Sequence, residues 1–472
     1  MGTRTVLNAR YLEALGSARL AELLIDISKG RPVARRRLLL ELAGHEGTGA
    51  LATAVRRRLA AIGRSRSVLE RGKRHDLTDE LELYRESIVE RIAGEDAAAA
   101  LGLMWQFMGL ANAILDRCHD GDDTFVSTFD ASDLGDIASA AAPDPLELVD
   151  RVFEALTQNA YGQYDDLVRV MTPTLREEGL NRLKQLMIEY SKTPVAQLPE
   201  AHRPRIDRRY TGTAVEEEIA ERALSKTVRA ALQDIADAQG DVDAFIDQYD
   251  DDDRKDPEVA AGIARRLLAA GRADEALEAT EDADHDGEGF LTAPRLEWED
   301  ARIDSLEAVG RSDEAQALRW TCFERSLSAR HLRAYLRRLP DFDDLEAEEK
   351  ALDHVQTSHS PVTALSFLIS WPALDRAAAL VIAQAGNFEG IFDDILTPAA
   401  DALAARHPLA ATLVLRAMID HALGEGHSVR DKHVAHRLLD CSSLAPAVRD
   451  FGAFETHDAY EARLRREDEG SF

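Results

Sequence analysis

The residues with the clearest chemical potential are arginines near the start of the chain. Residues 29–74, called the arginine arm below, contain 13 Lys and Arg residues but only three Glu residues, a net charge of +10. Guanidinium groups bind carboxylates and phosphates through pairs of parallel hydrogen bonds, so this composition predicts anion binding. The candidate binding residues are Arg35, Arg36, Arg37, Arg56, Arg57, Arg58, Arg64 and Arg66.

Each run of three arginines in the arm has to be shared between solvent and protein. Consecutive helical residues are about 100° apart, so three of them span about 200° of a helix. We therefore expect one guanidinium of each run to lie along, or pair with, a neighbouring surface. The whole chain has a net charge of −29, which leaves −39 for the part outside the arm. This acidic remainder favours pairing of the arm within the protein.

The other interpretation is that the arm presents a basic patch to RNA, DNA or an acidic protein. No aromatic residue lies between residues 29 and 74, which disfavours stacking on single-stranded nucleic acid. The net negative charge of the chain also repels nucleic acid and anionic membranes on average. We therefore expect a protein partner more than nucleic acid, and no membrane association.

Three groups of residues resemble metal sites. Asp282, Asp284, Asp286 and Gly287 match the start of a calcium loop, but Ala293 occupies the twelfth position, where such loops need a glutamate. Two other groups have no accompanying motif: Asp116, His119, Asp120, Asp122 and Asp123 form one, and His421, His427, His433, His436 and Cys441 form the other. For all three groups we therefore expect an ordinary polar surface and no metal site.

Linear catalytic signatures are absent from the sequence. It has no GxSxG nucleophile turn, no GxxxxGK[ST] phosphate loop and no GxGxxG motif after a strand. We therefore lean towards a protein without enzymatic activity or a cofactor, while an enzyme or metal site in a groove stays open as an alternative. The three cysteines have no CxxC spacing and an odd number, which favours reduced thiols and a cytoplasmic location.

Composition predicts a helical protein. The chain has 472 residues, of which 45% are hydrophobic and only 6% are aromatic, and β-branched runs, which favour sheets, are scarce. The first 20 residues contain three arginines and lack the apolar core of a signal peptide. Ala97–Leu115 is uncharged over 19 residues but is rich in alanine and contains Gln106 and Asn112, so we expect a buried central helix.

The pattern along the chain divides it into four parts. Helical periodicity is interrupted where Asp, Gly, Ser and Thr dominate, and a second interruption contains Pro194, Pro199 and Pro204. The predicted parts are an N-terminal helical region 1–116, an acidic and polar loop 117–145 with at most one helical turn, a middle helical region 146–249 with a proline-rich crossover 192–212, and a repeat region 257–472.

The repeat region contains two similar segments. Residues 261–277 and 301–318 each have an apolar helix that ends at Gly-Arg-x-Asp-Glu-Ala, with Gly271 and Gly310 separated by 39 residues. A turn glycine followed by an acidic helix start is typical of tetratricopeptide hairpins, whose usual period is 34 residues. A helical hairpin buries only one face, so such hairpins must stack on their neighbours.

Longer strings support a family resemblance. They include "GRSDEAQALRW", "ALSFLISWP" and "HPLAATLVLRAMI" in the second half, and "LNARYLEALGSARLAELL" and "LGLMWQFMGLA" in the first. With these strings the chain resembles an uncharacterised family of bacterial helical proteins. The resemblance implies an all-helical, tetratricopeptide-like array, and it implies no catalytic residues.

Together these patterns predict an all-α protein, an α-solenoid of stacked tetratricopeptide-like hairpins with a helical N-terminal part. The function that we expect is an intracellular scaffold for protein–protein interaction. The alternatives are a nucleic-acid-associated protein that uses the arginine arm, and an enzyme or metal-binding protein with a site in the groove of the solenoid.

Overall fold

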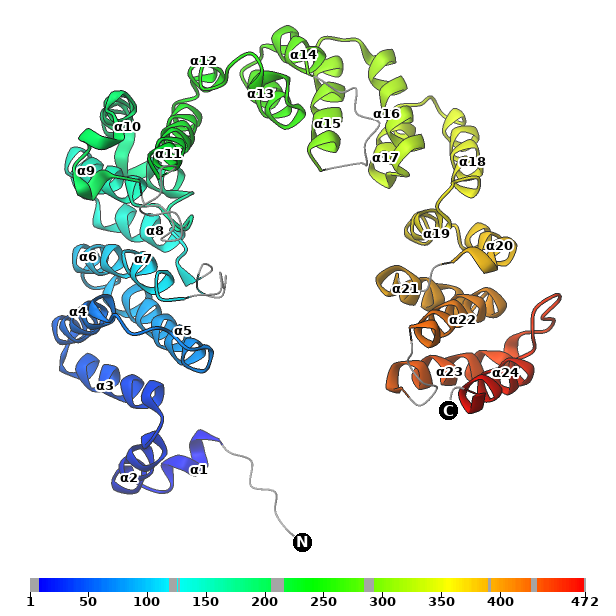
Figure 1. Cartoon of the computed structure of the whole chain (residues 1–472), viewed down its shortest axis with the longest axis horizontal. Coiled ribbons are helices and arrows are strands. Elements are labelled where there is room, and N and C mark those ends of the chain that lie inside the picture. The colour runs from blue at the N-terminus through cyan, green and yellow to red at the C-terminus, as the bar shows by residue number, and fades with distance from the viewer. Residues whose placement is uncertain are drawn as a thin grey trace. The chain divides into compact units, whose positions relative to one another are not determined.

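A computed structural model describes residues 8–118, 125, 128–204, 216–283, 293–388, 392–425 and 431–470. Within these residues the chain is helical and contains no strand, so the predicted all-α class is confirmed there (Figure 1). The chain divides into two compact units, Met1–Asp250 and Asp251–Phe472. The predicted regions 1–116 and 146–249 are not separate domains, because residues of both share one hydrophobic core.

The N-terminal unit is formed by helices that pack mainly on neighbours close in the chain. The π-helix η1 continues directly from α5, and the two short 3-10 turns η3 and η4 occupy the described part of the proline-rich crossover. The elements are α1 (Ala9–Glu13), α2 (Ser17–Ser28), α3 (Pro32–Glu46), α4 (Thr48–Arg64), α5 (Arg71–Glu86), η1 (Ser87–Ile92), α6 (Ala97–Met108), α7 (Leu110–Leu115), α8 (Ser132–Ala141), α9 (Pro145–Thr157), α10 (Leu167–Lys192), η3 (Val195–Gln197), η4 (Glu200–His202), α11 (Glu216–Gln239) and α12 (Val242–Ile246).

The uncharged segment Ala97–Leu115 forms the centre of this unit. It is divided at Gly109 into α6 and α7, and α6 packs against α4, α8 and η1. Among the described residues, this is the one segment that is both long enough and apolar enough to cross a membrane. However, 61% of it is buried inside the protein. The prediction of a buried central helix is therefore confirmed.

The prediction of a polar loop over residues 117–145 is wrong for α8, a helix of ten residues. Phe129 lies 5.2 Å from Phe107 of α6 between ring centroids, and Phe129 and Leu134 are buried. These apolar residues are spaced between Asp, Ser and Gly, whose turn preference hides them in the sequence. Contact with α6 supplies the burial that stabilises the helix.

The C-terminal unit is also a succession of helices, each in contact with the next along most of the chain. Its elements are η6 (Asp253–Lys255), α13 (Pro257–Ala269), α14 (Ala273–Glu281), α15 (Ala293–Ala308), α16 (Ser312–Ser326), α17 (Ala329–Leu336), α18 (Asp343–Gln356), α19 (Pro361–Ser370), α20 (Leu374–Ala383), η7 (Ala385–Asn387), α21 (Asp393–Ala404), α22 (Pro408–Gly424), α23 (Lys432–Leu444), η8 (Ala445–Ala447) and α24 (His457–Gly470).

The predicted repeat is visible as the same turn at two places. Gly271 follows α13 and Gly310 follows α15, with φ angles of +75° and +82° that glycine adopts without strain. The residue after each glycine donates its N–H to the carbonyl five residues earlier, at 2.9 Å and 2.8 Å, which closes the helix end. That residue is an arginine that pairs with a glutamate three residues later. The pairs are Arg272 with Glu275 and Arg311 with Glu314.

A third copy of this turn follows α11. Gly240 has a φ angle of +66°, and Asp241 donates its N–H to the carbonyl of Ala236 at 2.9 Å. The sequence there, Gly-Asp-Val-Asp-Ala, keeps the glycine but lacks the arginine and glutamate. The backbone turn therefore recurs where the side-chain pair does not.

A group of carboxylates lies where α11 packs against α10. Burial, reinforced by the nearby charges of Asp237 and Asp166, raises the pKa of Asp234 to about 6. Arg169, which pairs with Asp166 at 2.8 Å, opposes this shift only in part. Ionisation of Asp234 is therefore less favourable in the folded protein than in the unfolded chain, and it lowers stability as the pH rises through 6.

The turn glycines predict opposite effects of two alanine substitutions. Gly310→Ala places a Cβ at positive φ and should lower the free energy of unfolding by about 1–2 kcal/mol. Gly262→Ala, inside α13 with only the tip of Arg266 nearby, should raise it by about 0.5–1 kcal/mol. Denaturant titration of both variants is the measurement, and equal effects would contradict the assigned turn.

Asp234→Asn tests the carboxylate group. The folded pKa of about 6 exceeds the unfolded value of about 3.9, so the stability from this group is complete below about pH 4 and lost as pH rises through 6. The substitution should raise the melting temperature at pH 7–8, with a gain that disappears towards pH 4. Glu221→Gln, at an exposed position of α11, should show no such pH dependence.

Candidate functional site

The arginine arm lies on α3, α4 and the start of α5, and each run of arginines turns one side chain inward. Arg36 of α3 and Arg58 of α4 both pair with Glu80 of α5. Arg58 binds with two bonds, Nε to Oε1 at 2.6 Å and Nη2 to Oε2 at 3.1 Å. The prediction that one guanidinium of each run pairs with a neighbouring surface is confirmed.

Glu80 is the centre of this group. Its side chain is 2% exposed and also accepts a hydrogen bond from the Tyr84 hydroxyl at 3.1 Å. The hydrogen bond to Glu80 is the largest cause of the raised pKa of Arg58. Burial, followed by the charge of Glu80, raises the pKa of Tyr84 as well. One buried carboxylate thus joins three helices through two guanidinium groups and a phenol.

The other arginines of the candidate set face solvent. All six are exposed, and none forms an ion pair with a described residue of the chain. The expected internal pairing therefore accounts for Arg36 and Arg58, and the remaining guanidinium groups are accessible to an external anion. They are Arg35, Arg37, Arg56, Arg57, Arg64 and Arg66.

Exposed apolar side chains next to the arm are a feature that sequence reasoning missed. The chain begins its described part with two helices, α1 and α2, separated near Gly16. Ser28 is the one residue of α2 that is fully buried, and its leucines and isoleucines are largely accessible. The exposed apolar residues are Tyr11, Leu12, Leu15, Leu24, Ile25, Ile27, Leu39 and Leu42.

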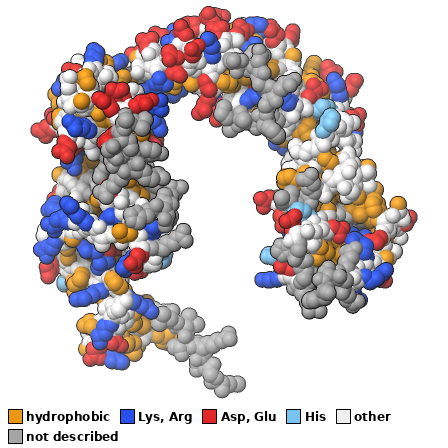
Figure 2. Space-filling view, viewed as in Figure 1, with side chains coloured by type: hydrophobic (Ala, Val, Ile, Leu, Met, Phe, Trp, Pro, Cys, Tyr) orange, Lys and Arg blue, Asp and Glu red, His pale blue; other side chains and the backbone are white. Residues whose placement is uncertain are grey.

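Arginine and apolar residues share one side of α3. Arg35, Leu39 and Leu42 are spaced by four and three residues, which places them on one helical face, and all three are exposed. In Figure 2 hydrophobic side chains and arginines lie next to one another on the surface of α2, α3 and α4. We call the exposed apolar residues on α1 to α3, together with the six exposed arginines, the N-terminal face.

The predicted metal-like groups do not form a metal site within the described residues. No group of three or more His, Cys, Asp or Glu side chains there is arranged so that it could hold a metal ion. His433 and His436 are exposed on α23, whereas Cys441 is buried and its pKa is raised to about 12 by burial. His119, Asp120, Asp122 and Asp123, most of the calcium-like loop, and His427 lie outside the described residues.

Glu80→Gln separates the structural arginines from the accessible ones. Removing the buried charge leaves Arg36 and Arg58 without their carboxylate and should lower the free energy of unfolding by about 3 kcal/mol. The matched change Arg56→Gln with Arg57→Gln removes two exposed charges and should alter it by less than about 0.5 kcal/mol. Thermal and denaturant unfolding of both variants is the measurement, and a Glu80→Gln protein as stable as the wild type would refute this assignment.

Comparison with known proteins identifies a family but no activity. No curated protein and no solved structure matches the chain. A family model described as a family of unknown function (DUF6880) matches residues 2–470. Because this match spans nearly the whole sequence, the chain belongs to that family of unknown function.

Proposed function

We propose that this protein is an intracellular binding scaffold, an α-solenoid of tetratricopeptide-like hairpins whose N-terminal face docks a protein partner. The repeated glycine turns after α11, α13 and α15 support the hairpin repeat. The contacts of α13 with α14 and α15, and of α15 with α16, support a stack in which each hairpin packs on its neighbour.

The observation that carries the proposal is the apolar surface of α2 and α3. Apolar side chains gain stability when a neighbouring surface covers them. Helices α2 and α3 instead expose Leu24, Ile25 and Ile27 on α2 and Leu39 and Leu42 on α3. Clustered exposed apolar side chains of this kind mark interaction surfaces.

The charges of the N-terminal face define the chemistry of the partner. Six arginines without an ion-pair partner among the described residues lie on α3, on α4 and just after α4, and Arg35 shares a face of α3 with Leu39 and Leu42. An amphipathic helix with leucine-like residues on one side and Asp or Glu at its edges would bury the apolar stripe and supply carboxylates to the guanidinium groups. The partner that fits is therefore an acidic protein segment of this type.

Nucleic acid is the second candidate, because the exposed arginines could also bind phosphates. Nucleic acid would contact only the arginines of the N-terminal face, however, and not its apolar side chains. A phosphate backbone gives the leucines and isoleucines of α2 and α3 nothing to pack against, and the arm offers no aromatic ring for base stacking.

Introducing negative charge into the apolar stripe of α3 tests the proposal. Leu39→Glu with Leu42→Glu should weaken binding of a synthetic helix with leucines on one face and flanking glutamates by at least about tenfold, because it removes apolar contact and adds repulsion. Fluorescence anisotropy measures the affinity. Binding to the wild type should weaken as salt rises, because exposed charges are screened.

The matched control changes leucines of similar exposure in the other unit. Leu345→Glu with Leu439→Glu should leave peptide binding unchanged. In pull-downs from native extract, proteins retained by the wild type and this control should be absent from the Leu39/Leu42 variant and unaffected by nuclease. Nuclease-sensitive capture, or tight binding of a short RNA that the Arg56→Gln, Arg57→Gln change abolishes, would favour the nucleic-acid alternative and overturn the proposal.

A further inference from the structure

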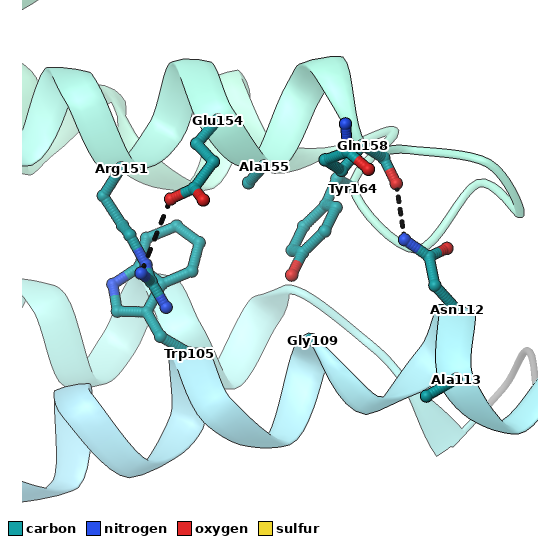
Figure 3. Close-up of a pocket in the computed structure, with 9 residues that line it drawn as sticks. All are labelled: Trp105, Gly109, Asn112, Ala113, Arg151, Glu154, Ala155, Gln158 and Tyr164. Atoms are coloured by element: carbon teal, nitrogen blue, oxygen red, sulfur yellow. Dashed lines mark hydrogen bonds and ion pairs between the residues drawn. The ribbon is translucent and has the colours of Figure 1, made fainter. Parts of the chain in front are cut away.

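A pocket of about 250 Å³ opens in the N-terminal unit between α6, α7 and α9 (Figure 3). Trp105 on α6 and Tyr164, in the segment before α10, provide aromatic walls, and Arg151 and Glu154 approach from α9. The volume is below the roughly 300–1,000 Å³ of sites for drug-sized ligands. A ligand of matching size is a single ring with short substituents.

Small residues leave the middle of the pocket open. Gly109, at the junction of α6 and α7, lies on the side opposite Ala155 of α9, and Ala113 follows one turn after the glycine. Larger side chains at these positions would fill the space between the two helices. The opening is therefore set by side-chain size at the contact between α6, α7 and α9.

The ring of Tyr164 is buried, whereas its hydroxyl is available to a ligand at the pocket. The residue is 4% exposed, its ring packs at 6.3 Å from that of Trp105, and the hydroxyl points into the pocket without a hydrogen-bond partner among the described residues (Figure 3). Burial raises the pKa of Tyr164 to about 12, so the phenol stays protonated and can donate. A ligand acceptor in the pocket can receive this hydrogen bond in place of solvent.

Arg151 places a cation at the other end of the pocket. Its guanidinium lies 5.5 Å from the centroid of the Trp105 ring and 3.5 Å from a Glu154 oxygen. Both members of this ion pair are about half exposed, at 50% and 52%, and pairs of this kind contribute only about 0–1 kcal/mol. The guanidinium can therefore turn to a ligand anion at little cost.

The wall that carries Tyr164 is held in place before any ligand arrives. Asn112 donates to the carbonyl of Gln158 at 2.8 Å and accepts from the Gln163 amide at 3.2 Å. The backbone N–H of Tyr164 donates to the side-chain oxygen of Asn159 at 3.0 Å. A fixed wall lowers the entropy lost when a ligand binds.

We propose that this pocket binds a small aromatic carboxylate that carries a hydrogen-bond acceptor opposite its carboxylate. The ring packs against Trp105 between Gly109 and Ala155. The carboxylate pairs with Arg151, and the distal acceptor receives the hydrogen bond of the Tyr164 phenol. None of these residues belongs to the N-terminal face, so this site is independent of partner docking there.

Three matched probes test the assignment on the full chain. 4-Hydroxybenzoate has all the required groups, benzoate lacks the distal acceptor, and 4-hydroxybenzamide lacks the charge. We expect ligand-observed NMR titrations to show saturable binding of 4-hydroxybenzoate that is about five- to tenfold tighter than that of either other probe, as loss of a hydrogen bond or a charge contact predicts.

Variants assign each contact. Tyr164→Phe should reduce the affinity for 4-hydroxybenzoate to that for benzoate and leave benzoate binding unchanged. Arg151→Gln should abolish the preference over the amide, and Ala155→Leu should block all three probes. Tyr164→Phe and Arg151→Gln remove no strong contact within the protein, so the circular dichroism and melting temperature of these two variants should stay near those of the wild type.

Tyr190→Phe is the control for the phenol. Tyr190 is equally buried, but its hydroxyl donates to the carbonyl of His202 at 2.7 Å. Its substitution should therefore lower stability and leave probe binding unchanged, the reverse of the result for Tyr164. Absence of saturable binding, equal affinity for the acid and its amide, or 4-hydroxybenzoate binding that Tyr164→Phe does not weaken would each overturn the proposal.

Discussion

A helix with one apolar face can be stable only where a neighbour covers that face, and this constraint governs both units. Helices α13 to α16 meet it in succession, since α13 contacts α14 and α15, and α15 contacts α16. The turns between them must be tight and reproducible, which a glycine at positive φ and the hydrogen bond across the helix end ensure. The same constraint is unmet at α2, where apolar side chains lie in solvent.

The arginines of this protein likewise divide into those that pair with a carboxylate and those that have no ion-pair partner among the described residues. In the C-terminal unit, arginines pair with carboxylates of the adjacent helix, as Arg319 does with Glu307 at 2.6 Å and Arg376 does with Asp353. In the N-terminal unit, Glu80 gathers Arg36 and Arg58, and the exposed arginines of α3 and α4 are left without described partners. Exposed guanidinium groups and uncovered leucines therefore occur together on α3, which is the physical basis for proposing a binding surface there.

The aromatic pocket shows how a packed helical core can still leave room for a ligand. Trp105 and Tyr164 are buried, but glycine and alanine at the contact between α6, α7 and α9 prevent the helices from filling the space. The result is an opening with one cation and one phenol that has no hydrogen-bond partner among the described residues. A small molecule there and a protein segment on the N-terminal face would use different residues of one unit.

The sequence by itself determined the local features: the helical class, the buried segment Ala97–Leu115, the glycine turns at Gly271 and Gly310, and the inward turn of one arginine in each run. These depend on residues within a few positions of one another, so periodicity and turn chemistry reveal them. Only the tertiary structure decided that Arg36 meets a carboxylate 44 residues away, that Phe129 and Leu134 stabilise α8, that α2 stays uncovered, and that Tyr164 faces Trp105. Each of these depends on which helices pack together, and the pattern of residues along the sequence does not specify which helices those are.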